Sequence, residues 1–348
     1  TQLVFSGIAL GMIYAVIAFG YELTFATSDT LNFGQGDALM LGALVGLTLV
    51  WGLNWSIMKL SLREMTPLMF RAITMTGGVL MLAAFIRLRG PWPTITRAQW
   101  KDVAVLALPN MLGWHLFSIL GVQALASGRA ATLGFTMPIW TVLLGALFFG
   151  QHLTRRGMLA ALCASVAVAL LIADEFTALA GRPMGVMWMQ IAAVCWALGT
   201  LMMRRTHVPL PTDVITVVMM AMTSVAFWAL ALAVEPWPSL NISGTVGWAL
   251  AWGVVVNYGV AQIIWFGLAR KLPPQARTFA LMAVPLVGAM TAGFIVDEPL
   301  RSTDLMAAGL FGLWHVIPST NVAAGNAAAL GMADGVVVAA AVAATTAV

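Results

Sequence analysis

The chain contains a succession of apolar segments, each about 18 to 22 residues long and almost free of charged side chains. Segments of this kind match α-helices that cross the hydrocarbon core of a bilayer, and they lack the alternation typical of barrel strands. Hydrophobic residues make up 61% of the chain and charged residues 9%, which is more apolar surface than a soluble domain can cover. The sequence therefore predicts an all-α integral membrane protein.

The apolar segments predict a ten-helix bundle with one extra N-terminal helix before it. We expect the ten spans at residues 43–60, 67–87, 103–124, 130–149, 157–173, 184–203, 214–235, 246–269, 278–296 and 304–317. The predicted domains are an extra helix and loop at residues 1–42, a first repeat at 43–174 and a second repeat at 184–317. An unassigned tail rich in Gly, Ala and Val follows at residues 318–348.

An internal repeat divides this bundle into two halves. Residues 124–158 and 268–306 share one pattern: a short basic turn, an apolar run with a central proline, a polar break and a new apolar run. Aligning Pro138 with Pro285 gives an offset of about 147 residues. Because each copy has an odd number of helices, the second copy must enter the membrane upside down. The sequence thus predicts two inverted five-helix repeats, an arrangement typical of transporters whose site lies between the halves.

The basic residues predict the orientation of the bundle. Lys and Arg collect in cytoplasmic loops, and eleven of the seventeen basic residues fall in alternate loops. They are Arg87, Arg89, Arg97, Lys101, Arg155, Arg156, Arg204, Arg205, Arg270, Lys271 and Arg277. We therefore expect a multi-pass protein of the cell inner (plasma) membrane with both ends of the ten-helix unit in the cytoplasm. The net charge of +4 then reflects topology and not nucleic-acid binding.

Several short motifs follow one another in a characteristic order: Trp51-Gly52-Leu53-Asn54, Arg71 after Pro67, Pro138 and Pro285, and Asp297-Glu298-Pro299-Leu300. With these marks, residues 43–313 resemble the drug/metabolite transporter superfamily, in its ten-helix branch of two EamA-type repeats. The first half departs from that family at Gly150-Gln151-His152-Leu153, where a glutamate is usual. The resemblance implies a secondary carrier, often an exporter of amino acids or related metabolites.

The N-terminal residues carry a different likeness. The runs Leu10-Gly11-Met12-Ile13-Tyr14-Ala15 and Leu31-Asn32-Phe33-Gly34-Gln35-Gly36 resemble the start of branched-chain amino-acid ABC permeases, over residues 1–48. The alternative function is therefore a permease subunit of such a transporter. It would need a separate ATPase subunit as partner, because the chain has no Gly-x-x-x-x-Gly-Lys-Ser/Thr loop of its own.

Polar and aromatic side chains at membrane depth are the substrate-binding candidates: Asn54, Trp55, Trp114, His115, Trp196, Asn257, Tyr258 and Gln262. Of these, Asn257, Tyr258 and Gln262 lie on overlapping faces of one expected helix and would hydrogen-bond a zwitterion. Hydrogen bonds between helices explain such amides equally well.

Basic residues, a histidine and two prolines are the candidates for roles in the transport mechanism. Lys59 and Arg71 would pair with a substrate carboxylate if they face inward, with Glu64 as a protein partner for either; alternatively they extend to the membrane interface. No acidic residue lies in the middle of an expected span, so His115 is the candidate for proton coupling, and hydrogen bonding within the bundle is its alternative. Pro138 and Pro285 are candidate hinges.

Other functional classes lack their motifs. The chain has no His-Glu-x-x-His, no Gly-x-Ser-x-Gly and no aspartate in the middle of a span, so we expect no enzyme. Cys163 and Cys195 stand alone, which predicts neither a metal site nor a disulfide, and no cofactor is expected. A structural scaffold stays an alternative, although inverted repeats favour a protein that changes conformation during transport. The predicted function is a secondary transporter of small organic solutes, an exporter or facilitator of amino acids or metabolites that works by alternating access between inverted repeats. Its expected partners are a small-molecule substrate and the lipid bilayer, with no nucleic acid, and homo-oligomers are left open.

Overall fold

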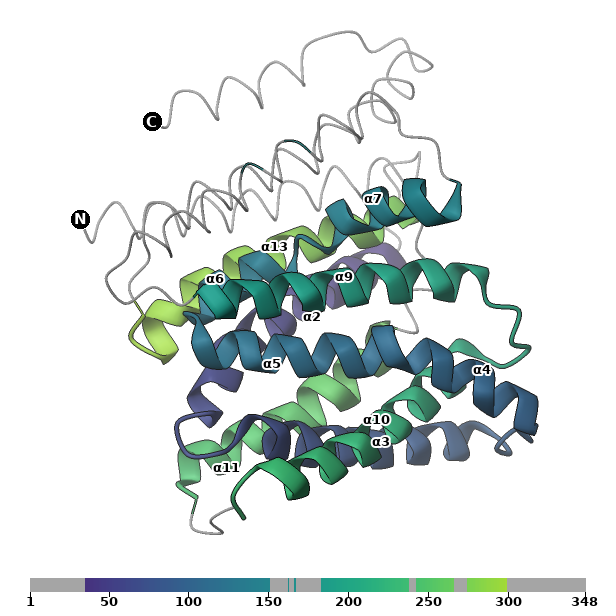
Figure 1. Ribbon diagram of the computed structural model, residues 1–348, viewed down its shortest axis with the longest axis horizontal. Coiled ribbons are helices and arrows are strands. Elements are labelled where there is room, and N and C mark those ends of the chain that lie inside the picture. The colour runs from purple at the N-terminus through teal and green to yellow at the C-terminus, as the bar shows by residue number, and fades with distance from the viewer. Residues whose placement is uncertain are drawn as a thin grey trace, which may run out of the picture.

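The described part of the computed structural model, residues 35–150, 162, 166, 183–237, 242–265 and 274–298, contains helices and no strands (Figure 1). Seven of its helical segments are long and apolar enough to cross a membrane: Gly42–Ser61, Pro67–Arg89, Arg97–Ala124, Ser127–Phe149, Pro183–Arg205, Thr212–Val234 and Gly244–Trp265. The prediction of an all-α membrane protein is confirmed. The N-terminal helix expected before residue 35, the tenth span and the tail lie outside the described residues, as does the fifth span apart from residues 162 and 166.

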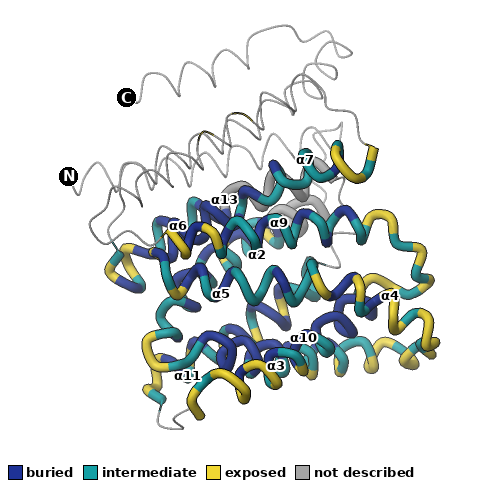
Figure 2. Tube along the Cα trace, in the orientation of Figure 1, coloured by how far each residue is buried: buried dark blue, intermediate teal, exposed yellow. Residues whose placement is uncertain are grey.

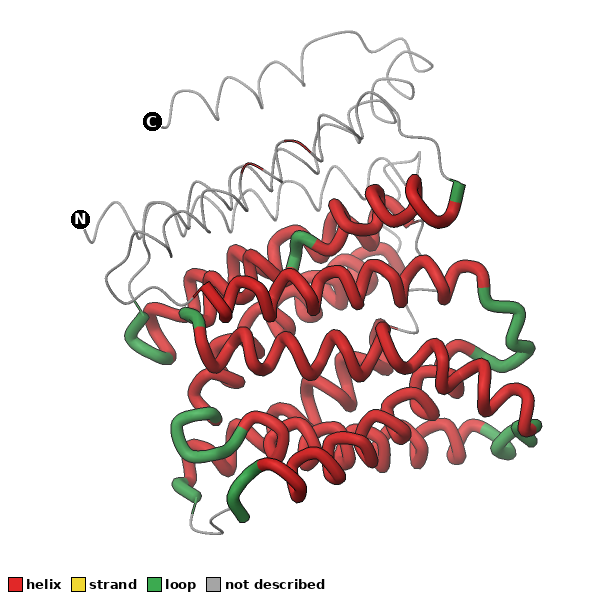
Figure 3. Tube along the Cα trace, in the orientation of Figure 1, coloured by secondary structure: helices red, strands yellow, loops and turns green. Residues whose placement is uncertain are grey.

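The helices lie side by side, and the loops that join them gather at the two ends of the bundle (Figure 3). In chain order they are α2 (Gln35–Ser61), α3 (Pro67–Arg89), α4 (Arg97–Ala107), η1 (Leu108–Gly113), α5 (Trp114–Ala124), α6 (Ser127–Gly134), α7 (Met137–Phe149), α9 (Pro183–Arg205), α10 (Thr212–Val234), α11 (Gly244–Ala251), η2 (Trp252–Val260) and α13 (Pro274–Ile295). Buried positions lie on the faces between helices, and exposed positions are concentrated on outer faces and at helix ends (Figure 2).

Several helices begin earlier than the apolar pattern predicts, because polar residues form their first turns. α4 begins at Arg97 and not at residue 103, since Thr96 closes a capping box: the Gln99 amide donates to its hydroxyl, and its own amide donates to the Gln99 side chain. α2 begins at Gln35 and runs without a break through the expected domain boundary at residue 42.

The third helix of each repeat contains a π-helical segment, which the sequence did not predict. η1 interrupts the helix from Arg97 to Ala124, and η2 interrupts the helix from Gly244 to Trp265. Asn110 in η1 and Asn257 in η2 are separated by the repeat offset of about 147 residues. Single-turn π segments inside α-helices frequently occur at functional sites.

The backbone supports the internal repeat at a second pair of positions. The two residues with clearly positive φ in the described part are Gly150, at 64°, and Asp297, at 58°, again one repeat offset apart. Each follows the fourth helix of its repeat, where a left-handed residue ends a helix. Asp is one of the few residues other than Gly that adopt this conformation. Both copies of the fourth helix therefore end in the same way.

The two candidate hinge prolines differ in their local structure. Pro138 lies in the first turn of α7, after a break at Phe135 and Thr136 that separates α7 from α6. There its missing N–H costs nothing, because the first amides of a helix have no intrahelical partner. Pro285 instead lies inside the continuous helix α13. The fourth helix is thus divided in the first repeat and unbroken in the second.

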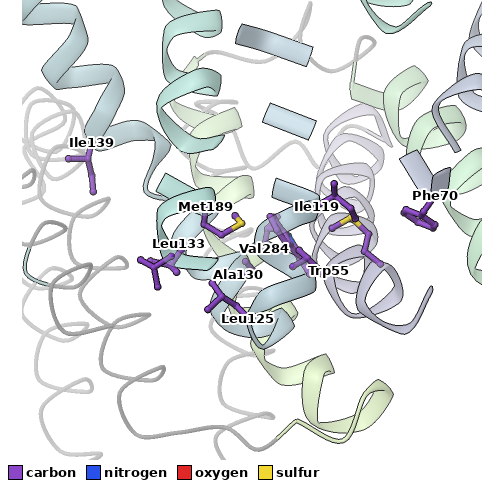
Figure 4. Packing of buried hydrophobic residues seen from close by; sticks show 13 residues of the cluster. Trp55, Phe70, Ile119, Leu125, Ala130, Leu133, Ile139, Met189 and Val284 are labelled. Atoms are coloured by element: carbon purple, nitrogen blue, oxygen red, sulfur yellow. The ribbon is translucent and has the colours of Figure 1, made fainter. Parts of the chain in front are cut away.

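The largest inter-repeat core joins α2 and α5 of the first repeat to α9 and α13 of the second. Trp55, Ile119, Met189 and Val284 belong to this cluster of buried side chains (Figure 4). Glycines allow the closest approaches: a Cβ on Gly199 of α9 would lie 2.7 Å from the Asn110 Cα of η1. Backbone contact of this kind leaves no room for adjustment, so the π segment packs directly on the first helix of the opposite repeat.

Replacing Gly199 with alanine should therefore lower the thermal stability of the detergent-purified protein. The added methyl meets the Asn110 backbone, and overpacking of this kind typically costs about 1–3 kcal/mol. Gly46→Ala on α2 is the matched control, because its Cβ would meet nothing within 4 Å. Equal melting temperatures for the two variants would contradict the close approach.

Candidate functional site

Arg71 lies inside the protein where the two repeats meet. Its side chain is 4% exposed, which agrees with the alternative that it faces inward and not with the one in which it extends to the membrane interface. Nη1 donates to the Tyr258 hydroxyl of η2 at 2.9 Å, and Nη2 donates to Ser118 Oγ of α5 at 3.2 Å. Nε has no hydrogen-bond partner. Within the described residues the guanidinium thus bonds two neutral hydroxyls and no carboxylate.

One face of α5 carries Ser118, a hydrogen-bond partner of Arg71, together with two candidate site residues. Trp114 and His115 precede Ser118 by four and three residues, the spacing that places side chains on one helical face. The His115 ring centroid lies 5.7 Å from that of Tyr258. Its Nδ1 donates to the Met111 carbonyl at 2.9 Å, because a carbonyl can only accept. This bond agrees with the interpretation of His115 as a histidine held within the bundle.

Aromatic rings extend from this face across to the second repeat. Trp114 contacts Trp55 of α2 edge to face, with ring centroids 6.2 Å apart, and contacts Trp196 of α9 at 4.5 Å. Phe135 lies edge-on to Trp196 at 5.9 Å. We call Trp55, Trp114 and Trp196 the tryptophan cluster. The structure thus brings together three of the aromatic residues that the sequence proposed separately.

The candidate amide side chains make no hydrogen bonds between the described helices. Asn54, Asn257 and Gln262 form no side-chain hydrogen bond with any described residue. Asn257 is 7% exposed and Gln262 is half-buried. Because Asn257 and Tyr258 belong to the π segment η2, the regular helical spacing used to group them with Gln262 does not hold there. Their amide groups remain available to a ligand.

Lys59, unlike Arg71, bonds backbone carbonyls at the end of a helix. Its Nζ donates to the carbonyls of Val122, Gln123 and Leu125 at 2.9, 3.0 and 2.7 Å. These carbonyls end α5, where a cation is favoured by the helix dipole and by the unsatisfied acceptors. The described contacts of Lys59 therefore stabilise a helix end.

Three glutamates cap helices of the opposite repeat at one end of the bundle. Glu64 accepts from the Ser243 amide and hydroxyl at 2.7 Å each, before α11. Glu235 accepts from the amides of Leu68 and Met69 in α3, at 2.8 and 2.9 Å. Glu298 accepts from the Ser127 amide and hydroxyl at the start of α6, at 2.6 and 2.7 Å.

We call Glu64, Glu235 and Glu298 the carboxylate caps. Each places a negative charge on free N–H groups at the positive end of a helix, a favourable and charge-assisted arrangement. At the same end, Arg63 of the first repeat donates to the Val296 carbonyl of the second at 3.0 Å. This end of the bundle is therefore held by polar bonds between the repeats.

Neither Ser118 nor the carboxylate caps could be predicted from the sequence. An isolated serine in an apolar helix carries no signal of its own, and its partner is distant in the chain. The cap partners are 166 to 179 residues apart, so no local pattern joins them. The one sequence signal was the acidic break at Asp297 and Glu298 after an apolar run.

The Glu64 cap should make stability depend on pH. Hydrogen bonds from the Ser243 amide and then its hydroxyl lower the pKa of the Glu64 carboxyl below its ordinary 4.5. The folded protein thus binds this proton less readily than the unfolded chain, so the cap stabilises above pH 4.5 and is lost as pH falls through the lowered pKa. Wild type should melt above Glu64→Gln near neutral pH, and the gap should close on acidification. A gap independent of pH would refute this.

The model of the EamA-like transporter family matches residues 38–173 and 183–313. The chain belongs to the EamA-like transporter family. The predicted resemblance is confirmed, and the protein is a multi-pass membrane transporter of this family.

Curated relatives carry names of the same kind. The uncharacterized transporter YoaV of Bacillus subtilis is 20% identical over 78% of this chain and 92% of its own length. The uncharacterized inner membrane transporter YedA of Escherichia coli K12 is 23% identical, over 78% and 87% respectively. A probable amino-acid metabolite efflux pump of the same strain is 24% identical, over 76% and 89%.

A solved structure shows the same fold. One crystal structure matches with a TM-score of 0.57 at 22% identity, covering 80% of this EamA-like chain and 96% of the solved chain. The ABC permease alternative gains no support: the family match begins at residue 38, inside the segment that resembles permeases.

Proposed function

We propose that this EamA-like protein is a secondary transporter of small organic solutes, an exporter or facilitator of amino acids or related metabolites in the inner membrane. The observation that carries the proposal is the position of Arg71, buried between the repeats and bonded to both. The names of two relatives agree with it, one an inner membrane transporter and the other a probable amino-acid metabolite efflux pump.

The mechanism we infer is alternating access between the inverted repeats. The carboxylate caps join the repeats at one end of the bundle, the end opposite the basic residues Arg87, Arg89, Arg204 and Arg205. Under the orientation expected from those basic residues, the caps face away from the cytoplasm. Opening a path on that side requires the caps to exchange their helix amides for water, and the exposed Glu64 does so at little cost.

The candidate residues divide into roles by their surroundings. Arg71 would bind the carboxylate of the substrate, and Asn54, Asn257 and Gln262 offer unoccupied amides for its other polar groups. The tryptophan cluster would pack against its apolar part. His115, next to Tyr258, is the candidate for proton coupling. Pro138, at the start of α7, and Pro285, inside α13, are the candidate hinges.

Counterflow into proteoliposomes tests the proposal directly. Purified protein is reconstituted without ATP, loaded with an unlabelled amino acid or carboxylate metabolite, and supplied with the labelled compound outside. A secondary carrier should show saturable uptake that is faster with substrate inside than with empty vesicles. Uptake that is absent for every compound, or that requires added ATP and a partner, would contradict the proposal.

Cross-linking the capped end should stop transport. In a Glu64→Cys, Ser243→Cys variant, a short bifunctional methanethiosulfonate reagent would join the repeats where the Glu64 carboxylate now meets Ser243. Flux should fall to the level of empty vesicles and return on reduction, because one of the two open states is then inaccessible. The variants with only one of these two substitutions, which like the double variant keep Cys163 and Cys195, are the controls for the reagent. Full flux in the completely cross-linked protein would refute alternating access at this end.

A further inference from the structure

The charge of Arg71 has no counter-ion in the described structure. Burying a charged group without a carboxylate partner is costly, and two neutral hydroxyls offset only part of that cost. Such a group inside a membrane domain usually marks a functional site. A ligand that brought one negative charge would complete the arrangement.

The donors around Arg71 suit one carboxylate. Nε is buried and unpaired, and each Nη has a further N–H beyond the bond it makes. The Tyr258 hydroxyl accepts from Arg71 and keeps its own proton for donation. A planar carboxylate matches the fork of a guanidinium with two parallel hydrogen bonds. One such group would bond Arg71 on α3 and Tyr258 on η2 together, and so contact both repeats.

The same surroundings disfavour a positive charge on the substrate. The acidic side chains that the structure describes all lie in loops or near helix ends: Glu64, Asp102, Asp213, Glu235, Asp297 and Glu298. None contacts Arg71. Among the described residues, the ammonium group of an amino acid would thus meet the guanidinium and neutral groups and no carboxylate. Like charges at short distance in a weakly polar interior repel strongly.

An apolar surface adjoins the anion site. Trp114 lies one helical turn from Ser118 on α5 and contacts Trp55 and Trp196. Half-buried Trp114 and Trp196 offer flat faces to a hydrocarbon or aromatic group. Trp114 and Ser118 are separated by about 6 Å along the axis of α5, which is the rise of four helical residues. A small molecule spans that distance.

From these contacts we infer that the transported substrate is an organic monoanion: a monocarboxylate with an apolar or aromatic side group and no ammonium, such as the 2-hydroxy or 2-oxo acid that corresponds to an amino acid. This inference rests on the proposed function and names the substrate class of its site. Zwitterionic amino acids with the same side group are the disfavoured competitors.

Matched pairs of compounds test the charge preference in the wild-type protein. 3-Phenyllactate and phenylalanine share a side chain and a carboxylate and differ in hydroxyl against ammonium; 2-hydroxy-4-methylpentanoate and leucine form an aliphatic pair. Counterflow should favour each hydroxy acid by about tenfold to a hundredfold in kcat/KM, the scale of one charged hydrogen bond gained or lost. Equal or faster transport of the amino acids would overturn the inference and leave the carrier function standing.

Variants of Arg71 show whether this residue is the origin of the preference. Arg71→Met should abolish hydroxy-acid transport, and Arg71→Lys should retain the anion preference with weaker binding, because it keeps the charge and loses the fork. Arg87→Met, exposed on the same helix, is the matched control and should behave as wild type. If Arg71→Met fails to fold, the Arg71→Lys variant and the matched compounds on the wild-type protein still test the anion preference. Undiminished hydroxy-acid transport by folded Arg71→Met would overturn the inference.

Ligand-induced thermal stabilisation separates the inference from the carrier function. 3-Phenyllactate should raise the melting temperature of the wild-type protein, phenylalanine at equal concentration should raise it less, and Arg71→Met should respond to neither. This pattern without any flux would support the anion site and contradict the transport proposal. Equal stabilisation by both compounds would overturn the anion site, whatever the flux.

Discussion

The bond between Arg71 and Tyr258 is the constraint on which the proposed mechanism depends. It joins the second helix of one repeat to the π segment of the other, and it keeps a full positive charge inside the bundle with hydroxyl partners alone among the described residues. A protein that needed only stability would gain from an apolar residue here, since buried charges rarely repay their desolvation. A ligand that supplies the missing negative charge would offset the desolvation cost of Arg71, and this gain would contribute to the free energy of binding.

The rest of the structure combines symmetry with local asymmetry. The π segments, the left-handed residues Gly150 and Asp297, and the order of helices recur in both repeats. Arg71, by contrast, is a residue of the first repeat that bonds Ser118 in the same repeat and Tyr258 in the other. Symmetric helices allow the two repeats to exchange conformations. An asymmetric site fixes which chemical group is bound while they do so. The carboxylate caps add polar bonds at one end, and those of the exposed Glu64 form and break at little cost because they face water.

Sequence patterns predicted the architecture well and the site only in outline. Length and hydropathy determine a membrane helix, so the spans within the described residues appear where the apolar runs indicated, apart from first turns set by caps such as Thr96. Trp55, Trp114 and Trp196 were proposed singly, and tertiary packing showed that they meet. The inward position of Arg71 was not decidable from helical spacing, since a residue one turn from a helix end can face either way. The π segments escaped prediction because apolar periodicity does not distinguish a π turn from an α turn within a membrane helix.

The most direct test of the central claim is an experimental structure of the protein with a heavy-atom analogue, 4-iodophenyllactate, located by the anomalous scattering of iodine. The account predicts the carboxylate about 2.7–2.9 Å from nitrogen atoms of Arg71, and the iodinated ring against Trp114 of the tryptophan cluster. An analogue bound elsewhere, with Arg71 still bonded only to Tyr258 and Ser118, would contradict the claim that this buried charge is the substrate anchor.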